Sequence, residues 1–139
     1  MSSEKKDNIP PLKRLLFIDD DEVMLALFYT AFENAAYDYV VKTTSKAEEF
    51  LSLKESFEPD LLLLDLKMPE LDGPGIIARL EDAGNTVPII FVTGKSQVKM
   101  EEEYKKIHVI GVVNKPFDVQ ELPQTIENIW SGHHKNNEN

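Results

Sequence analysis

Residues 59–69 of this chain read PDLLLLDLKMP, and this stretch decides the fold class. Its four leucines, at positions 61–64, form a continuous apolar run that ends directly at Asp65. A short apolar run without polar alternation is typical of a strand buried on both faces, as the strands of a parallel sheet are. The stretch therefore predicts a central strand with a carboxylate at its carboxyl end.

Apolar runs on either side of this stretch predict four further strands, at residues 15–18, 39–41, 87–92 and 109–113. The segments between the runs carry apolar residues at helical spacing. They predict five helices: one at 22–34, one opening at residue 45, a short one after a Gly-Pro-Gly loop at 73–75, one at 96–106 and one after residue 118. Strand–helix alternation with such long crossovers requires parallel pairing. The predicted fold is α/β, a five-stranded parallel sheet with helices on both faces.

Capping signals predict where two of these helices begin. Ser45, with Glu48 three residues later, forms a capping box. Asp118 and Glu121 form a second box before the last helix. Pro123 lies early enough in that helix to be tolerated, or to delay its start by one turn.

The length of 139 residues fits one domain, predicted at 12–131, with polar tails at 1–11 and 132–139. Fifteen basic against 25 acidic residues give a net charge of −10, which disfavours direct binding to nucleic acid or anionic lipid. No apolar run has the length of a membrane span or of a signal-peptide core. The absence of cysteine is compatible with a reducing cytoplasm, the predicted location.

Polar residues follow four of the five predicted strands: Asp19, Asp20 and Asp21, then Asp65, Thr93 and Lys115. In open parallel sheets, ligands bind beyond the carboxyl ends of the strands, where the strand order reverses. Clustered carboxylates repel one another unless a cation neutralises them. Mg²⁺ prefers oxygen ligands and commonly takes one or two carboxylates plus a phosphate oxygen. We therefore predict a Mg²⁺ site with Asp20 and Asp65 as ligands and with Asp19 acting directly or through water.

The same residues suit phosphoryl transfer. A carboxylate beside a metal, here Asp65, can act as a nucleophile towards phosphorus. The transferred group has three equatorial oxygens, which Mg²⁺, the Lys115 ammonium and the Thr93 hydroxyl can each stabilise. This chemistry accounts for each residue type at the strand ends.

Four motifs together resemble the receiver domains of two-component response regulators, the chemotaxis-type single-domain regulators among them: FIDDD at 17–21, PDLLLLDLKMP at 59–69, VTG at 92–94 and VNKPF at 113–117. The resemblance covers residues 12–130. It implies a flavodoxin-like strand order of 2-1-3-4-5 and Asp65 as the phosphoacceptor. It also implies that Asp19, Asp20, Asp65 and the Lys67 backbone carbonyl hold Mg²⁺, and that the Lys115–Pro116 peptide bond is cis.

The resemblance also implies the partners. The donor would be a phosphohistidine on a histidine kinase or a histidine phosphotransfer protein, and phosphorylation would switch contacts with a downstream protein that the sequence does not name. The chain would be a monomer or a phosphorylation-dependent dimer. Its only catalysis would be self-directed phosphoryl transfer and autodephosphorylation, so it would not be an enzyme in the usual sense.

The chain departs from the family pattern at Val112, where the family often has Tyr or Phe, and at Gly94, where Ala is common. We predict that phosphorylation moves the Thr93 loop and is read out through the fourth helix and fifth strand without an aromatic rotamer swing. Lys67 and Lys95 flank the phosphoryl site. Either lysine contacts the phosphoryl group or obstructs the water that hydrolyses it, or both are simply solvated.

Two other functions stay open at this point. The pattern Asp19-x-Asp21-x-Val23 also resembles haloacid-dehalogenase phosphatases, which would make Asp19 the nucleophile and leave Asp65 unexplained. The alternative is a binding-only module that is never phosphorylated. His133 and His134, adjacent in the predicted tail, indicate an inert segment more than a metal site.

Overall fold

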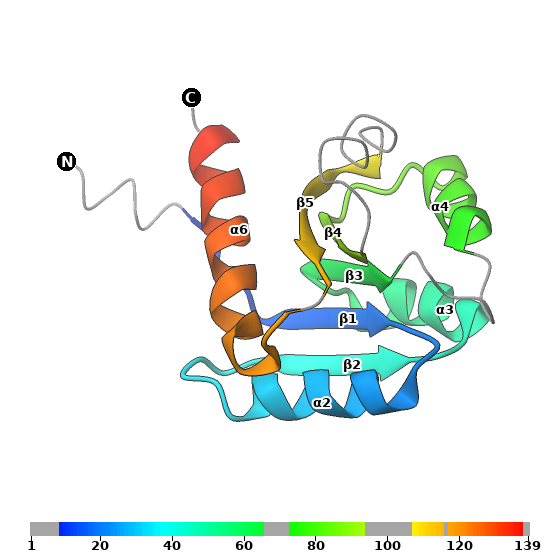
Figure 1. Cartoon of the computed structure of the whole chain (residues 1–139). Coiled ribbons are helices and arrows are strands. Elements are labelled where there is room, and N and C mark those ends of the chain that lie inside the picture. The colour runs from blue at the N-terminus through cyan, green and yellow to red at the C-terminus, as the bar shows by residue number, and fades with distance from the viewer. Residues whose placement is uncertain (1–8, 66–72, 94–106, 116, 138–139) are drawn as a thin grey trace.

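The computed structural model describes residues 9–65, 73–93, 107–115 and 117–137. The strands are β1 (Arg14–Ile18), β2 (Val40–Thr44), β3 (Leu61–Asp65), β4 (Ile89–Thr93) and β5 (Val109–Asn114). The helices are α2 (Glu22–Glu33), α3 (Ala47–Phe57), α4 (Gly73–Asp82), the 3-10 turn η2 (Val119–Glu121) and α6 (Leu122–Asn137) (Figure 1). The predicted helix at 96–106 lies outside the described residues. Among the described residues, no helix combines the length and the apolar character needed to cross a membrane.

The sheet has the order β2-β1-β3-β4-β5, and every neighbouring pair is parallel. This confirms the predicted fold class and strand order. The register places Ile18 beside Leu64, Asp65 beside Val92 and Thr93 beside Asn114. The carboxyl ends of β1, β3, β4 and β5 therefore meet along one rim of the sheet, where the candidate site lies.

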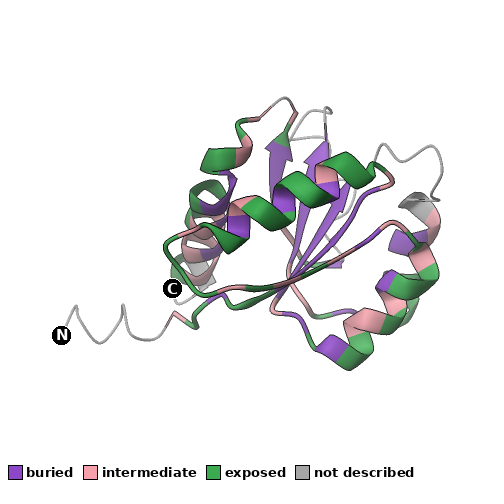
Figure 2. Cartoon of the chain, turned by 90° about the horizontal axis from the view of Figure 1, so that it is seen from below, coloured by how far each residue is buried: buried purple, intermediate pink, exposed green. Residues whose placement is uncertain are grey.

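Alternate residues of the strands point to opposite faces of the sheet, and each face carries its own helices. One face packs against α3 and α4 through Leu16, Leu62, Leu64, Phe91 and their neighbours. The other packs against α2 and α6 through Leu15, Phe17, Leu63, Val92 and their neighbours. Figure 2 shows the buried strands enclosed between these two layers of helices. Because helices cover both faces of the sheet, both faces of the central strands are buried, which explains why these strands are apolar throughout.

Helix α2 buries a narrower stripe than its sequence pattern indicates. Leu25, Phe28 and Phe32 are buried in the core. Val23 and Leu27 belong to the same apolar pattern but are 69% and 46% exposed. An apolar surface therefore remains on the outside of the helix.

The predicted capping box at Ser45 and Glu48 is wrong. The strand β2 extends to Thr44, and the N-cap of α3 is Lys46, whose side chain makes no capping hydrogen bond. The Thr44 hydroxyl instead accepts a hydrogen bond from the Lys46 amide at 3.1 Å. Glu48 pairs with Arg79 of α4. The Glu48 carboxylate therefore forms a tertiary ion pair instead of the capping hydrogen bond that the local sequence pattern predicted.

Two helix ends also differ from the sequence prediction. The Gly-Pro-Gly segment is not a loop, because α4 begins at Gly73 and places Pro74 in its first turn, where the missing N–H is not needed. The predicted frayed tail from residue 132 is wrong as far as Asn137, since α6 continues to that residue. The His134 ring lies 4.2 Å from the Trp130 ring and is hydrogen-bonded to the Trp130 carbonyl, so these contacts stabilise the last turns.

The start of the last helix agrees with the prediction. The Asp118 carboxylate accepts the Gln120 amide at 2.9 Å and caps η2. The α-helix begins one turn later at Leu122, with Pro123 as its second residue. The same helix also holds the N-terminal segment, because the Trp130 indole of α6 donates a hydrogen bond to the Pro10 carbonyl at 2.7 Å.

Candidate functional site

Three carboxylates meet at the rim where β1 and β3 end side by side. Asp19 directly follows β1, Asp20 comes next, and Asp65 is the last residue of β3. Each offers one oxygen, and these oxygens all lie within 4.8 Å of one another. Asp19 and Asp65 are buried and Asp20 is half-buried. The sequence predicted this cluster, and the parallel pairing of β1 with β3 brings it together.

Lys115 supplies a positive charge to the rim. It follows β5, and its ammonium lies 2.5 Å from Asp65 Oδ2 and 4.0 Å from Asp19 Oδ2. Burial alone would lower the pKa of Lys115, but the hydrogen bond to Asp65 and the negative charges of Asp65, Asp19 and Asp20 raise it overall. The ammonium therefore stays protonated and neutralises part of the acidic cluster.

Asp19 is a buried carboxylate whose two oxygens have unequal hydrogen bonding. Its Oδ1 accepts the Asp21 amide at 3.0 Å, whereas its Oδ2 is buried and has no hydrogen-bond partner among the described residues. Burial raises its pKa to about 7, and the charge of Asp65 adds to that shift, while the Asp21 amide and Lys115 act against it. A buried carboxylate oxygen without a donor is energetically unfavourable, and binding of a proton or a cation would stabilise it.

The donor set fits a hard divalent cation. Three carboxylates at this spacing carry more negative charge than Lys115, the one ammonium found beside them among the described residues, can offset. The Asp19 oxygen that lacks a donor faces Lys115 only at ion-pair distance. Mg²⁺ takes such oxygen ligands together with water and phosphate oxygens. Asp19, Asp20 and Asp65 would hold it. The Lys67 carbonyl, predicted as a further ligand, lies outside the described residues.

The remaining predicted residues are placed as follows. Thr93 is the last residue of β4 and is fully buried, and its carbonyl accepts the Lys115 amide at 2.9 Å. This bond joins the two strand ends that carry the hydroxyl and the ammonium. Val112 lies in the core at 7% exposure, so the position of the usual family aromatic points inward. Gly94, Lys95 and Pro116 lie outside the described residues.

Asp21 does not join the cluster. Its Oδ1 accepts the amides of Val23 and Met24 at 3.0 and 3.3 Å, which makes it the N-cap of α2. This disfavours the phosphatase interpretation, which leaves Asp65 without a role although Asp65 is the residue that Lys115 contacts.

Sequence reasoning missed one supporting residue. The Thr44 carbonyl, at the end of β2, accepts the Asp19 amide at 3.2 Å and holds the backbone that carries the buried carboxylate. Thr44 itself is buried. The pairing of β1 with β2 creates this contact, and the strand order implied by the resemblance is the only signal that could have predicted it.

Comparisons with known proteins agree with this geometry. The family model of the response regulator receiver domain matches residues 15–127. The tetrathionate response regulatory protein TtrR of Salmonella typhimurium is 31% identical over 110 residues, which cover 79% of this chain and 52% of TtrR. The alkaline phosphatase synthesis transcriptional regulatory protein PhoP of Bacillus subtilis is 30% identical over 122 residues, which cover 84% of this chain and 48% of PhoP. The chain thus spans about half the length of these curated relatives.

Solved structures show the same architecture. A CheY-like response regulator receiver domain protein from Methanospirillum hungatei superimposes with a TM-score of 0.71 at 24% identity, covering 91% of this chain and 99% of that one. A response regulator signal receiver domain from Bermanella marisrubri has a TM-score of 0.70 at 26% identity, covering 86% and 98%. Because the family model matches most of the chain and the acidic rim lies where such a fold places its site, this chain belongs to the response regulator receiver domain family.

Proposed function

We propose that this chain is the phosphoacceptor of a two-component phosphorelay and that Asp65 takes up the phosphoryl group. The observation that carries the proposal is the contact between Lys115 and Asp65 at 2.5 Å, beside a buried Asp19 oxygen that lacks a donor. An ammonium and a candidate cation site beside one carboxylate suit phosphoryl transfer to that carboxylate, because both can neutralise the charge of the transferred group.

In the proposed reaction, an Asp65 oxygen attacks the phosphorus of a phosphohistidine on the partner. The phosphorus–oxygen bond forms as the phosphorus–nitrogen bond breaks, and the leaving imidazole keeps the electron pair of that bond. Lys115 holds the Asp65 side chain before transfer and then donates to a phosphoryl oxygen. The Thr93 hydroxyl donates to another. Mg²⁺, held by Asp19, Asp20, Asp65 and the Lys67 carbonyl, would supply charge neutralisation when bound.

The proposal extends to partners and regulation. The donor is a histidine kinase or a histidine phosphotransfer protein, and the phosphoryl group leaves by hydrolysis within the domain. Because Val112 is already inward, we propose that the signal passes through the Thr93 loop and β5 without an aromatic swing. The downstream partner is a protein, and the chain works in the cytoplasm as a monomer or a phosphorylation-dependent dimer.

Labelling with acetyl phosphate and MgCl₂, followed by intact mass measurement, tests the proposal. The wild-type chain and the exposed control Asp82→Asn should gain one phosphoryl group, whereas Asp65→Asn should not. Undiminished labelling of Asp65→Asn would contradict the assignment. Failure of the wild type under conditions that label a control receiver would support a binding-only module. Turnover of p-nitrophenyl phosphate that is lost in Asp19→Asn and kept in Asp65→Asn would favour a phosphatase.

A further inference from the structure

Strand β2 forms one edge of the sheet, and its outer side is open among the described residues. Figure 1 shows it as the outermost strand, with α2 beside it. The Val40 amide donates to the Lys13 carbonyl at 2.7 Å, so Val40 directs its main-chain groups towards β1. Alternate residues of a parallel strand direct these groups to opposite sides. The N–H and C=O groups of Val41 and Thr43 therefore point outward, and such an edge can take up a further strand.

Exposed basic side chains lie along this edge: Lys13 and Arg14 where β1 begins, Lys42 in β2, and Lys46 two residues after β2. None of the four forms an ion pair with a described carboxylate, although the chain has 25 acidic and 15 basic residues. The carboxylate of Asp60 lies nearby, but it accepts the main-chain amides of Lys13 and Arg14 at 3.0 and 2.9 Å. The edge thus carries positive charge that the described fold leaves without a counter-charge.

Two of these cations lie on the face of the sheet that α3 covers. The Arg14 guanidinium carbon and the Lys42 ammonium lie 4.7 and 5.4 Å from the centre of the Phe57 ring, at the end of α3. Arg14 Nε also donates to the Phe57 carbonyl at 3.0 Å, which leaves the two terminal amino groups of the guanidinium without a described partner. A strand added outside β2 would place every second side chain on this face. Carboxylates at those positions would complement Lys42 and Arg14.

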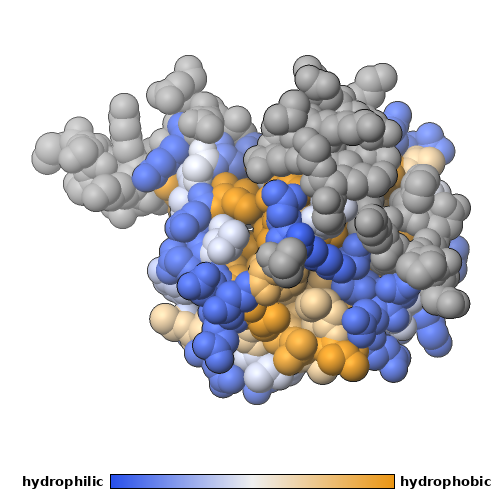
Figure 3. All heavy atoms as spheres, in the orientation of Figure 1, coloured by the Kyte–Doolittle hydropathy of each residue, from blue (hydrophilic) through white to orange (hydrophobic). Residues whose placement is uncertain are grey.

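The other side chains of an added strand would face α2. A hollow of about 520 Å³ lies there, lined by Ala26 and Tyr29 of α2 and by Thr43 of β2. Figure 3 shows apolar surface over α2, the helix that borders this hollow. Glu22 and Glu49 also line it, so a second carboxylate is disfavoured there and an apolar side chain is favoured.

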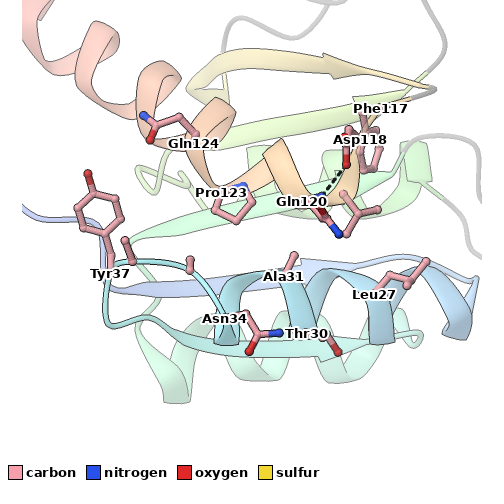
Figure 4. A pocket seen from close by; sticks show the side chains of 13 residues that line it. Leu27, Thr30, Ala31, Asn34, Tyr37, Phe117, Asp118, Gln120, Pro123 and Gln124 are labelled. Carbon is pink, nitrogen blue, oxygen red and sulfur yellow. Dashed lines mark hydrogen bonds between the residues drawn. The ribbon is translucent and has the colours of Figure 1, made fainter.

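The hollow between α2 and the start of α6 does not suit such an acidic segment. Its volume is about 790 Å³, and its lining contains no described basic residue (Figure 4). Asp118 is the charged residue of this lining. The charge of the β2 edge, and not that of this hollow, thus complements an acidic partner.

The same charges disfavour other occupants of the β2 edge. Pairing of β2 with β2 of a second copy would bring two edges of like charge together, and a lysine on an edge strand hinders such pairing. Anionic lipid and nucleic acid carry dense negative charge, which the net charge of −10 repels. A short acidic segment avoids much of this repulsion because it contacts only the basic edge.

From these observations we propose that the outer edge of β2 binds an extended segment of a partner protein in which acidic residues alternate with apolar ones. The main chain of the segment bonds to Val41 and Thr43. Its acids lie beside Lys42 and Arg14, and its apolar side chains face α2. The edge and its cations are formed without a phosphoryl group, so this binding does not depend on the phosphoryl transfer proposed above.

Three synthetic peptides of about nine residues, long enough to cover a strand, test the proposal on the full unphosphorylated chain. The first alternates glutamate with valine, the second has lysine in place of glutamate, and the third is the first with N-methylated main-chain amides. Fluorescence anisotropy should show binding of the glutamate peptide at least about tenfold tighter than of the other two. Amide hydrogen exchange of Val41 and Thr43 should slow when it binds. Equal binding of the three peptides, or protection confined to other elements, would overturn the proposal.

A charge reversal locates the acids of the segment. Lys42→Glu should weaken binding of the glutamate peptide at least about tenfold and strengthen binding of the lysine peptide. Lys135→Glu changes the net charge equally at an exposed residue of α6, and it should alter binding less than about twofold. Equal losses in the two variants would mean non-specific attraction and would contradict the proposal.

A filled hollow tests the apolar positions. Ala26→Tyr, which fills the hollow beside Thr43, should weaken binding of the glutamate peptide about fivefold. Ala83→Tyr, at an exposed residue just after α4, should leave binding unchanged. The same affinity in both tyrosine variants would contradict the proposed orientation of the segment. Circular dichroism melting curves confirm that each variant is folded.

Three further measurements complete the test. Asp65→Asn should bind the glutamate peptide within about twofold of the wild type, and Lys42→Glu should still be labelled by acetyl phosphate, so a failure of this proposal is distinguishable from a failure of the proposed phosphoacceptor function. Binding of the wild type to phosphatidylserine vesicles or single-stranded DNA as tightly as to the glutamate peptide would assign the edge to a polyanion and overturn the proposal. Self-association that Lys42→Glu abolishes in analytical ultracentrifugation would assign the edge to a second copy and overturn it as well.

Discussion

The Lys115 ammonium lies 2.5 Å from an Asp65 carboxylate oxygen, although 50 residues separate them in the chain. The contact exists because β5 and β3 end at the same rim, one strand apart. It neutralises part of an acidic cluster, and it places a donor beside the proposed phosphoacceptor. We therefore expect stability and the proposed phosphoryl transfer to depend on the same pair.

Replacement of Lys115 by methionine removes this cation from the rim. Phosphorylation by acetyl phosphate should slow by on the order of 100-fold, because a donor that stabilises the transition state is lost. The chain should also lose about 1–3 kcal/mol of stability, since the buried Asp65 oxygen loses its donor and Asp65 and Asp19 then face each other without an ammonium. Lys115→Arg should restore stability better than rate, because the guanidinium fork differs in geometry from the compact ammonium.

Quench-flow or time-resolved mass measurement gives the rate, and urea unfolding gives the stability. Lys54→Met serves as the control, because Lys54 forms an ion pair with the exposed Glu55 at 3.6 Å, away from the rim. A rate for Lys115→Met equal to that of the control would remove Lys115 from the mechanism.

Metal-free protein should respond to pH through Asp19. Its pKa is about 7 in the folded chain, against 3.8 for an unperturbed aspartate side chain. The folded state therefore holds the extra proton between these values, and the stability that the proton contributes is lost as the pH rises through 7. Relative to the wild type, Asp19→Asn should be on the order of 2 kcal/mol more stable at pH 8 in EDTA and close to equal at pH 4. Urea unfolding of both proteins between pH 4 and pH 8 measures this difference in stability. A stability advantage of Asp19→Asn that grows as the pH falls would contradict the prediction.

Mg²⁺ should stabilise the chain by mass action. A ligand that binds only the folded state at 100 times its dissociation constant adds about 2.7 kcal/mol. Thermal unfolding with increasing MgCl₂ should therefore shift the melting temperature of the wild type upward, and EDTA should reverse the shift. Asp20→Asn should respond less, while Asp82→Asn, which removes an exposed carboxylate from α4, should respond fully. An equal response in both variants would place the ion elsewhere.

Gly111 should be required for the packing of α6 on β5. A Cβ atom at this position would lie 2.6 Å from Ile129 Cγ2, which is too close for any real contact. Gly111→Ala should cost about 1–3 kcal/mol, the range for overpacked cores. Ile129→Ala in the same chain should recover part of that loss, which a double-mutant cycle measures.

Gly132 provides the matched control for this substitution. It lies inside α6, and a Cβ atom there would meet nothing within 4 Å. Gly132→Ala should stabilise the chain by about 0.5–1 kcal/mol, because alanine favours the helix interior. If both alanine variants shift the urea midpoint in the same direction, close packing at Gly111 is not the cause.

The core of the fold could be predicted from the sequence because its signals are short-range. Continuous apolar runs such as residues 61–64 indicate strands covered on both faces, and the long crossovers between the runs require parallel pairing. The acids, the hydroxyl and the ammonium could be assigned to strand ends for the same reason. Asp21 and Asp118 cap their helices as the local pattern predicted.

Two predictions were wrong for different reasons. Glu48 forms a long-range ion pair with Arg79 of another helix instead of closing a capping box. His134 packs on Trp130, one turn earlier in the same helix, and α6 continues past its predicted end. Helical spacing likewise assigned Val23 and Leu27 to the same stripe as Phe28. Only the tertiary structure separates them, because burial depends on which elements pack against a helix.

The sequence by itself determined the order of the described strands and helices and which polar side chains stand at strand ends, since these depend on neighbours a few positions away. The tertiary structure decided that Lys115 contacts Asp65, that one Asp19 oxygen is buried without a donor, and that an apolar groove stays open beside α2. Distances between segments far apart in the chain follow from how the layers pack, and no local pattern specifies them.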